Sequence, residues 1–142
     1  MTFLNWHEDY AVGVPQIDKE HQKLFQLINE FHDRAKSGDP NSKSLNALIM
    51  LVVHAEEHFL HEETIMEMNG YPRLEHHRKL HAVLLVSISD FSKRFEENLI
   101  ARDLEMSSFL KFWLIEHIIF EDKDFHEFRL RKGEQAERSA EK

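Results

Sequence analysis

Two pairs of metal-binding side chains stand close together in the middle of the sequence, one on each side of a break. His58 lies four residues before Glu62, and His77 lies four residues before His81. Side chains with this spacing project from one face of a helix, so each pair can hold one ion. The break at residues 69–72 reads Asn-Gly-Tyr-Pro, which ends one helix and begins the next. We expect two antiparallel helices that bring three imidazoles and a carboxylate face to face, which is half of a metal site.

Two further helical segments place metal-binding residues on apolar stripes. His21 lies in such a stripe near the N-terminus, and His117 lies in another one near the C-terminus, followed by Glu121 and Asp122. Polar groups of this kind are costly to bury unless something compensates them. Five imidazoles and two carboxylates exceed what one ion can use, whereas two ions bridged by the carboxylates use all of them. Either Glu121 or Asp122 can supply the carboxylate of this last segment, and spacing alone favours Glu121.

The composition restricts the kind of metal site. The chain has 11 histidines, and imidazole is a common ligand of iron, copper and zinc. The absence of cysteine excludes disulfides, iron–sulfur clusters and thiolate zinc sites. Any metal must therefore be held by nitrogen and oxygen.

Charge and hydropathy restrict the partners and the compartment. The formal net charge of −8 argues against nucleic acid and against anionic membrane surfaces. No apolar run is long enough to cross a bilayer, so we expect no membrane insertion. The first residues lack the basic and apolar regions of a signal peptide. We therefore expect a cytoplasmic protein.

Long helices are needed to position these residues. With 4 glycines and 3 prolines the chain has few turns, which favours helices over strands. We predict an all-α fold, an antiparallel up-down-up-down four-helix bundle with an ordered N-terminal arm over residues 1–16. The four helices are expected from Asp18 to Lys36, from Asp39-Pro40 to the stop at Asn69-Gly70, from Pro72 to about residue 95, and from about Asp103 to Arg131. The bundle should occupy residues 1–132, followed by a polar, frayed tail over residues 133–142.

Several stretches of the sequence resemble the hemerythrins, and more closely their single-domain bacterial members, the bacteriohemerythrins. These stretches are NWHEDYAVGVPQIDKEHQKLFQLINEFHD, EEHFLHEETIMEMNGYP, HHRKLH and FLKFWLIEHIIFEDKDF. They contain, in order, the family's His, HxxxE, HxxxH and HxxxxD. The resemblance implies a non-heme di-iron centre with an oxo or hydroxo bridge. His77, His81 and His117 would ligate one iron and His21 and His58 the other, while Glu62 and Asp122 would bridge both.

The resemblance also implies a function. With three bridging oxygens, three histidines complete an octahedral iron, whereas two histidines leave one position open on the other iron. In the hemerythrins this position takes dioxygen reversibly. The implied role is oxygen storage, delivery to an oxygen-consuming enzyme, or sensing, by a monomer that is not itself an enzyme. Two alternatives are a di-iron enzyme that reduces peroxide or nitric oxide, and an iron-responsive or zinc-binding interaction module.

The wall of the oxygen pocket should be apolar and should lack proton donors, because a general acid there would release peroxide. The candidates for this wall are Leu114, Trp113, Phe25, Phe59 and Ile118. Leu114 is the strongest of them because it lies one helical turn before His117.

The family pattern conflicts with regular helix geometry at one point. His117 and Asp122 are five residues apart, about 140° around a regular helix, whereas Glu121 is only about 40° from His117. We follow the pattern and predict a π-type widening of the helix between His117 and Asp122. His54, four residues before His58, competes as a ligand on spacing, and we expect it outside the ligand set. The remaining histidines are expected at the surface or against the arm: His7, His32, His61, His76 and His126.

Overall fold

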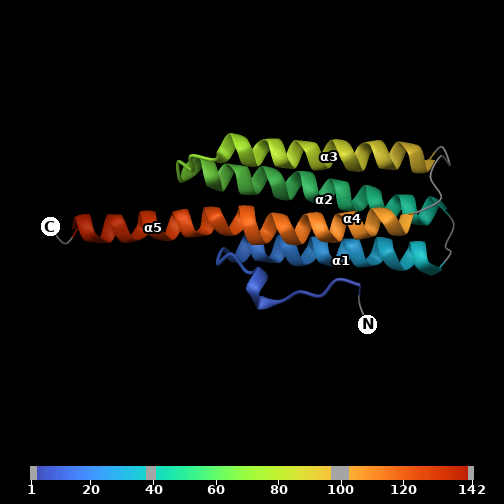
Figure 1. Cartoon of the computed structure of the whole chain (residues 1–142), viewed down its shortest axis with the longest axis horizontal. Coiled ribbons are helices and arrows are strands. Elements are labelled where there is room, and N and C mark those ends of the chain that lie inside the picture. The colour runs from blue at the N-terminus through green and yellow to red at the C-terminus, as the bar shows by residue number, and fades with distance from the viewer. Residues whose placement is uncertain (1–2, 38–40, 97–102, 141–142) are drawn as a thin grey trace.

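The computed structural model of the chain describes residues 3–37, 41–96 and 103–140, and it forms an antiparallel four-helix bundle (Figure 1). Three of the rods are single helices: α1 (Pro15–Ser37), α2 (Asn41–Met68) and α3 (Leu74–Glu96). The fourth rod consists of three segments in direct succession: α4 (Asp103–Glu116), the π-helical η2 (His117–Asp122) and α5 (Lys123–Ala140). The predicted fold class is confirmed.

The interior of the bundle has an apolar part and a polar part. Phe31, Leu48, Ile88 and Leu110, one from each rod, are buried in the apolar part. The rods alternate in direction, so the start of α1, the end of α2, the start of α3 and the segment η2 lie at a common level. This level holds the polar part, near the turn from α2 to α3.

The N-terminal arm runs beside α1 and is ordered, as predicted (Figure 1). It contains a short 3-10 turn, η1 (Glu8–Tyr10). The main-chain N–H of Leu4 donates to Oδ1 of Asn29 at 2.8 Å, and Nδ2 of Asn29 donates back to the Leu4 carbonyl at 2.7 Å. Trp6 and Tyr10 pack ring to ring against Phe25. The arm therefore covers the apolar face of α1 that would otherwise meet water.

The predicted start of the first helix at Asp18 is wrong. α1 begins at Pro15, whose fixed φ suits the first helical position. Oδ1 of Asp18 accepts a hydrogen bond from the N–H of Val12 at 2.7 Å and so holds the end of the arm. Gly13, next to Val12, has a φ of 85°, and a Cβ there would lie 2.6 Å from Cε1 of His126. The close passage of the arm past α5 requires glycine at this position.

The turn between α2 and α3 closes at the predicted place. Gly70 has a φ of 64° and its N–H donates to the Glu67 carbonyl at 3.1 Å, while the N–H of Tyr71 donates to the Met66 carbonyl at 3.0 Å. These two bonds form the Schellman motif that commonly ends helices at glycine. The third helix begins at Leu74 rather than at Pro72, because Pro72 is still part of the turn.

Two other predicted boundaries are the start of the second helix and the end of the fourth. Asp39 and Pro40, predicted to begin the second helix, lie outside the described residues. The prediction that the chain frays after Arg131 is wrong, since α5 continues to Ala140. Glu, Gln, Ala and Arg dominate this last stretch and are strong helix formers. The domain boundary at residue 132 stays a prediction. Among the described residues, no helix combines the length and the apolar character needed to cross a membrane.

Candidate metal centre

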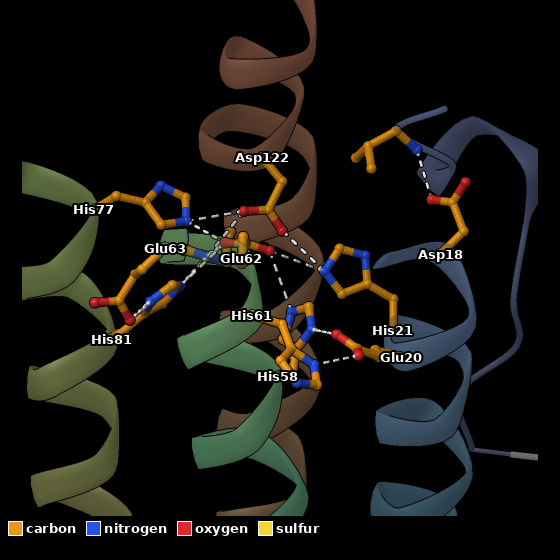
Figure 2. Close-up of polar contacts among 12 residues, drawn as sticks. Asp18, Glu20, His21, His58, His61, Glu62, Glu63, His77, His81 and Asp122 are labelled. Carbon is orange, nitrogen blue, oxygen red and sulfur yellow. Dashed lines mark hydrogen bonds and ion pairs between the residues drawn. The ribbon is translucent and has the colours of Figure 1, made fainter. Parts of the chain in front are cut away.

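Seven polar side chains from all four rods converge inside the bundle, and Figure 2 labels all of them except His117. Each of them is at most 4% exposed. They are His21 from α1, His58 and Glu62 from α2, His77 and His81 from α3, and His117 and Asp122 from η2. These are the seven residues that the sequence predicts as ligands, and the structure brings all of them together.

The imidazoles form two groups. The three-histidine group consists of His77, His81 and His117, and the two-histidine group consists of His21 and His58. Within each group, one ligand atom per imidazole and one oxygen of Glu62 all lie within 4.8 Å of one another. Each group is therefore compact enough to surround one ion.

Glu62 divides its two oxygens between the groups. Oε1 faces the three-histidine group, at 3.3 Å from Nε2 of His81 and 3.7 Å from Nε2 of His117. Oε2 faces the two-histidine group, at 3.2 Å from Nε2 of His58 and 3.6 Å from Nε2 of His21. The carboxylate thus presents one oxygen to each group.

Asp122 is divided in the same way. Its Oδ1 lies 3.0 Å from Nε2 of His77 and 3.1 Å from Nε2 of His117, and its Oδ2 lies 3.0 Å from Nε2 of His21. Two carboxylates with this division can bridge a pair of ions, because each ion then receives one oxygen from each carboxylate.

The π-helical segment η2 explains how Asp122 reaches the cluster. The predicted widening between His117 and Asp122 is confirmed, since both residues are buried ends of this segment. Glu121, which a regular helix would favour, instead lies near the surface, with Oε2 at 3.6 Å from Nε2 of His76 and 3.9 Å from Nη2 of Arg73. One extra residue in the turn therefore selects the aspartate.

Two carboxylates hold imidazoles of the cluster from outside, and we call them outer anchors. Oε1 of Glu20 lies 2.8 Å from Nδ1 of His58, and Oε2 of Glu63 lies 3.0 Å from Nδ1 of His81. An ionised carboxylate only accepts hydrogen bonds, so Nδ1 of each imidazole donates. Nε2 then keeps its lone pair and points it into the cluster, as a metal ligand requires.

Sequence reasoning missed both outer anchors. Glu20 precedes His21 and Glu63 follows Glu62, so each lies about 100° around its helix from a predicted ligand. This position faces a neighbouring helix. An acidic residue directly beside a predicted ligand is the signal that could have found them.

The electrostatics of the cluster favour positive charge between the carboxylates. Burial opposes ionisation of Glu62 and Asp122, but the surrounding imidazoles outweigh it and lower the pKa of both. Burial also opposes protonation of His21 and His77, yet the two carboxylates raise the pKa of His21 to about 9 and that of His77 to about 10. Metal cations at the same place satisfy the same demand for positive charge.

The surroundings also shift the pKa values of the other three imidazoles and of the outer anchor Glu20. Burial opposes protonation of His117 and His58, but carboxylates raise the pKa of His117 to about 9 and also raise that of His58. Burial, helped by the neighbouring imidazoles, lowers the pKa of His81. Burial acts against ionisation of Glu20, but its hydrogen bonds with His58, Gln16 and His61 lower its pKa to about 2. Glu20 is therefore ionised and can act as an acceptor.

The cluster fits a pair of metal ions. Within the described part of the chain, seven buried side-chain nitrogen and oxygen atoms form no hydrogen bond. All of them belong to cluster residues: His21, His58, Glu62, His77 and Asp122. Buried polar atoms without partners are rare, and coordination to metal would satisfy them. The donors are imidazole nitrogens and carboxylate oxygens, a set that suits iron.

An apolar cavity of about 20 Å³ lies beside the cluster. Phe59, Trp113 and Leu114 contribute to its lining, together with aliphatic residues of all four rods. Phe59 stacks on His81 with ring centres 3.8 Å apart, and Trp113 stacks on His117 at 4.6 Å. Two other predicted wall residues, Phe25 and Ile118, are buried in the same apolar core but do not line this cavity.

The remaining histidines lie outside the two groups, as predicted. His54 lines surface hollows between α1 and α2 and belongs to neither group. His7 and His76 are exposed. His32 stacks on Phe3 of the arm at 3.8 Å. His61 and His126 are partly buried and make contacts that the sequence did not predict, with Glu20 and Gly13 respectively.

This geometry agrees with the relatives of the chain. Residues 12–128 match the hemerythrin HHE cation binding domain. The chain belongs to the hemerythrin family. It is 31% identical to the bacteriohemerythrin of Pseudomonas aeruginosa over 125 residues, which are 88% of this chain and 80% of the relative. Identity to the bacteriohemerythrin of Methylococcus capsulatus is also 31%, over 87% of this chain and 94% of the relative. A crystal structure of wild-type hemerythrin superposes with a TM-score of 0.82 at 27% identity, over 87% of this chain and 95% of that one.

Membership of the hemerythrin family establishes the cofactor and the general function. Hemerythrins hold a di-iron centre and bind dioxygen, and this hemerythrin chain has the buried cluster to hold metal ions. The predictions of family and of iron cofactor are confirmed. Members of the family are mainly oxygen carriers rather than enzymes.

Proposed function

We propose that this hemerythrin binds dioxygen reversibly at two irons held by the seven cluster residues. The three-histidine group and the two-histidine group would each take one ion, and Glu62 and Asp122 would bridge them. The observation that carries the proposal is the division of both carboxylates, one oxygen toward each group. If each ion received one oxygen from each carboxylate, the ion held by two histidines would have one ligand fewer and would keep a position free for dioxygen.

The surroundings of the cluster support reversible binding rather than turnover. An iron pair held by the seven cluster residues would supply the two electrons that dioxygen takes up on binding and would recover them when dioxygen leaves. Phe59, Trp113 and Leu114 line the apolar cavity beside the cluster, where water would find few hydrogen-bond partners. An apolar wall without a general acid does not deliver the proton that would release peroxide. Reversible binding suits storage, delivery to an oxygen-consuming enzyme, and sensing by a single chain.

The visible spectrum of the reduced protein, recorded before aeration, after aeration and after degassing, tests this proposal. We expect a strong band that appears with oxygen and disappears when oxygen is removed. Metal analysis of protein purified without added metal should give about two irons per chain, as a bridged pair requires. Continuous consumption of peroxide or nitric oxide would favour the enzymatic alternative, and a content dominated by zinc would contradict the proposal.

A further inference from the structure

The two outer anchors are themselves held in different ways. Both oxygens of Glu20 bind imidazoles, since Oε1 lies 2.8 Å from Nδ1 of His58 and Oε2 lies 2.8 Å from Nδ1 of His61 (Figure 2). Glu63 is held by an arginine, with Oε1 at 3.3 Å from Nε of Arg78. The anchor of the two-histidine group is thus fixed by a histidine together with Gln16, whose Nε2 donates to the same Oε2 at 2.8 Å, and that of the three-histidine group by a guanidinium.

We propose that Glu20 is a positioning residue of the two-histidine group, which sets the tautomer and the orientation of His58 and is itself set by His61. The inference rests on the proposed di-iron function, and it adds two residues that are not ligands. Neither Glu20 nor His61 faces the ions directly.

The hydrogen-bond geometry fixes the direction of each proton. Glu20 can only accept, so His58 and His61 both donate to it from Nδ1. Nε2 of His58 is then unprotonated and lies 3.2 Å from Oε2 of Glu62, where an ion would sit. Without Glu20, the His58 side chain, which is only 2% exposed, would lose the acceptor that selects this tautomer.

The two-histidine group depends on this single anchor. Neither nitrogen of His21 forms a hydrogen bond with any described residue, so His21 receives no comparable orientation. His58 is therefore the only imidazole of this group with an outer anchor. The group that would keep a position free for dioxygen therefore has one of its two imidazoles oriented from outside, by Glu20.

The anchor can be reached from solvent. The side chain of Glu20 is 18% exposed and that of His61 is 43% exposed. A surface hollow of about 150 Å³ lies over them, between α1 and α2. Small side chains at position 20 would admit water to Nδ1 of His58, so we expect a graded loss rather than a complete one.

Anaerobic titration of the metal-free protein with Co²⁺, followed by its absorption bands, tests the inference. We expect Glu20→Ala to weaken binding of the ion of the two-histidine group about 10–100-fold, the usual cost of losing an outer hydrogen-bond partner of a metal ligand. Glu20→Gln keeps the shape and one acceptor oxygen, so it should lose less. Glu63→Ala is the matched control and should weaken the ion of the other group. Circular dichroism of the metal-free variants checks that they fold, and Glu20→Gln carries the test if Glu20→Ala does not.

A double-mutant cycle with His58→Ala separates positioning from general stabilisation. In that background only the ion of the three-histidine group should remain, and Glu20→Ala should leave its affinity unchanged, whereas Glu63→Ala should weaken it. Wild-type affinity in Glu20→Ala, or a loss of affinity for the remaining ion when Glu20→Ala is added to His58→Ala, would overturn the inference and leave the proposed function intact. Failure of the wild-type chain to bind a pair of ions would overturn both.

Discussion

The two groups of histidines use the same kind of side chain in different surroundings. The three-histidine group is walled by aromatic rings, with Phe59 stacked on His81 and Trp113 stacked on His117. In the two-histidine group the rings of His21 and His58 meet edge to face at 4.6 Å. The first group is thus covered by aromatic rings of the core that stack on two of its imidazoles, whereas the imidazoles of the second group contact each other edge to face.

The difference arises from how the rods contribute to the cluster. α3 supplies two imidazoles one turn apart and η2 adds a third, whereas α1 and α2 supply one each. The shared carboxylates come from α2 and η2 and lie between the groups. An almost symmetric bundle therefore creates an asymmetric pair of sites through the number of imidazoles on each rod.

Removal of a shared carboxylate should have the largest effect, because it affects both groups at once. Glu62→Ala deletes the residue that approaches imidazoles of both groups, and we expect both ions to be lost. The loss should exceed the ~10–100-fold that an outer partner costs at each site. Iron content per chain is the measurement. Glu56→Ala, an exposed position on the same helix, is the control and should keep wild-type iron. Retention of one ion by Glu62→Ala would mean that the carboxylate serves only one group.

Removal of one imidazole should distinguish the groups. His58→Ala leaves His21 as the only imidazole of its group, so we expect this variant to keep only the ion of the three-histidine group and to lose the oxygen-dependent band. His117→Ala leaves two imidazoles in each group and should retain both ions, with weaker binding of one. Iron content and the aerated spectrum measure both effects. Equal iron content in the two variants would argue against the assigned asymmetry.

The sequence predicts the ligands better than it predicts what holds them. The HxxxE and HxxxH pairs lie one helical turn apart, so local geometry alone brings each pair to one face. His21 and His117 could be added because each lies on the apolar stripe of its helix, and the family pattern selected Asp122 rather than Glu121. Glu20 and Glu63 depend on how two neighbouring helices face each other, and their place beside a predicted ligand marks them only as candidates for that contact.

The helix ends also divide into those that local residues determine and those that long-range contacts determine. The stop at Gly70 was predictable because a positive φ and the Schellman bonds are properties of a few adjacent residues. The start of α1 was not, because Asp18 resembles a helix cap and is used instead to hold Val12 of the arm. A long-range contact replaces the local role of the same side chain.

Deletions in the fourth rod test how η2 shares Asp122 between the groups. Phe120 and Phe112 are similarly exposed, at 68% and 65%, but Phe120 lies in the π-helical segment and Phe112 in regular α4. Deleting Phe120 should convert η2 to a regular helix. The inward faces of α4 and α5 should then stay aligned, so that Asp122 stays one turn from His117. Deleting Phe112 should rotate the two parts of the rod by about 100° relative to each other.

We therefore expect the Phe120 deletion to fold and to keep both ions with a modest loss of affinity, and the Phe112 deletion to lose metal. Iron content and circular dichroism measure the outcome. If both deletions lost metal equally, the extra residue of the π segment would be essential to the bridge rather than an insertion that the helix accommodates.

The smallest expected effects concern the residues that hold the two outer anchors. His61→Ala removes a hydrogen bond of 2.8 Å to Glu20, and we expect the ion of the two-histidine group to bind about two- to tenfold more weakly. Arg78→Ala should weaken binding of the ion of the three-histidine group less than about fivefold, because Arg78 is an exposed ion-pair partner that also contacts Glu67 and Glu75.

Co²⁺ titrations at low and high salt separate the effect of His61→Ala from that of Arg78→Ala. At about 1 M salt, screening over ~3 Å should remove the effect of Arg78→Ala, whereas the effect of His61→Ala should persist. A larger loss for Arg78→Ala at low salt would show that the guanidinium, and not the imidazole, provides the stronger support, and the ranking of the two anchors would have to be reversed.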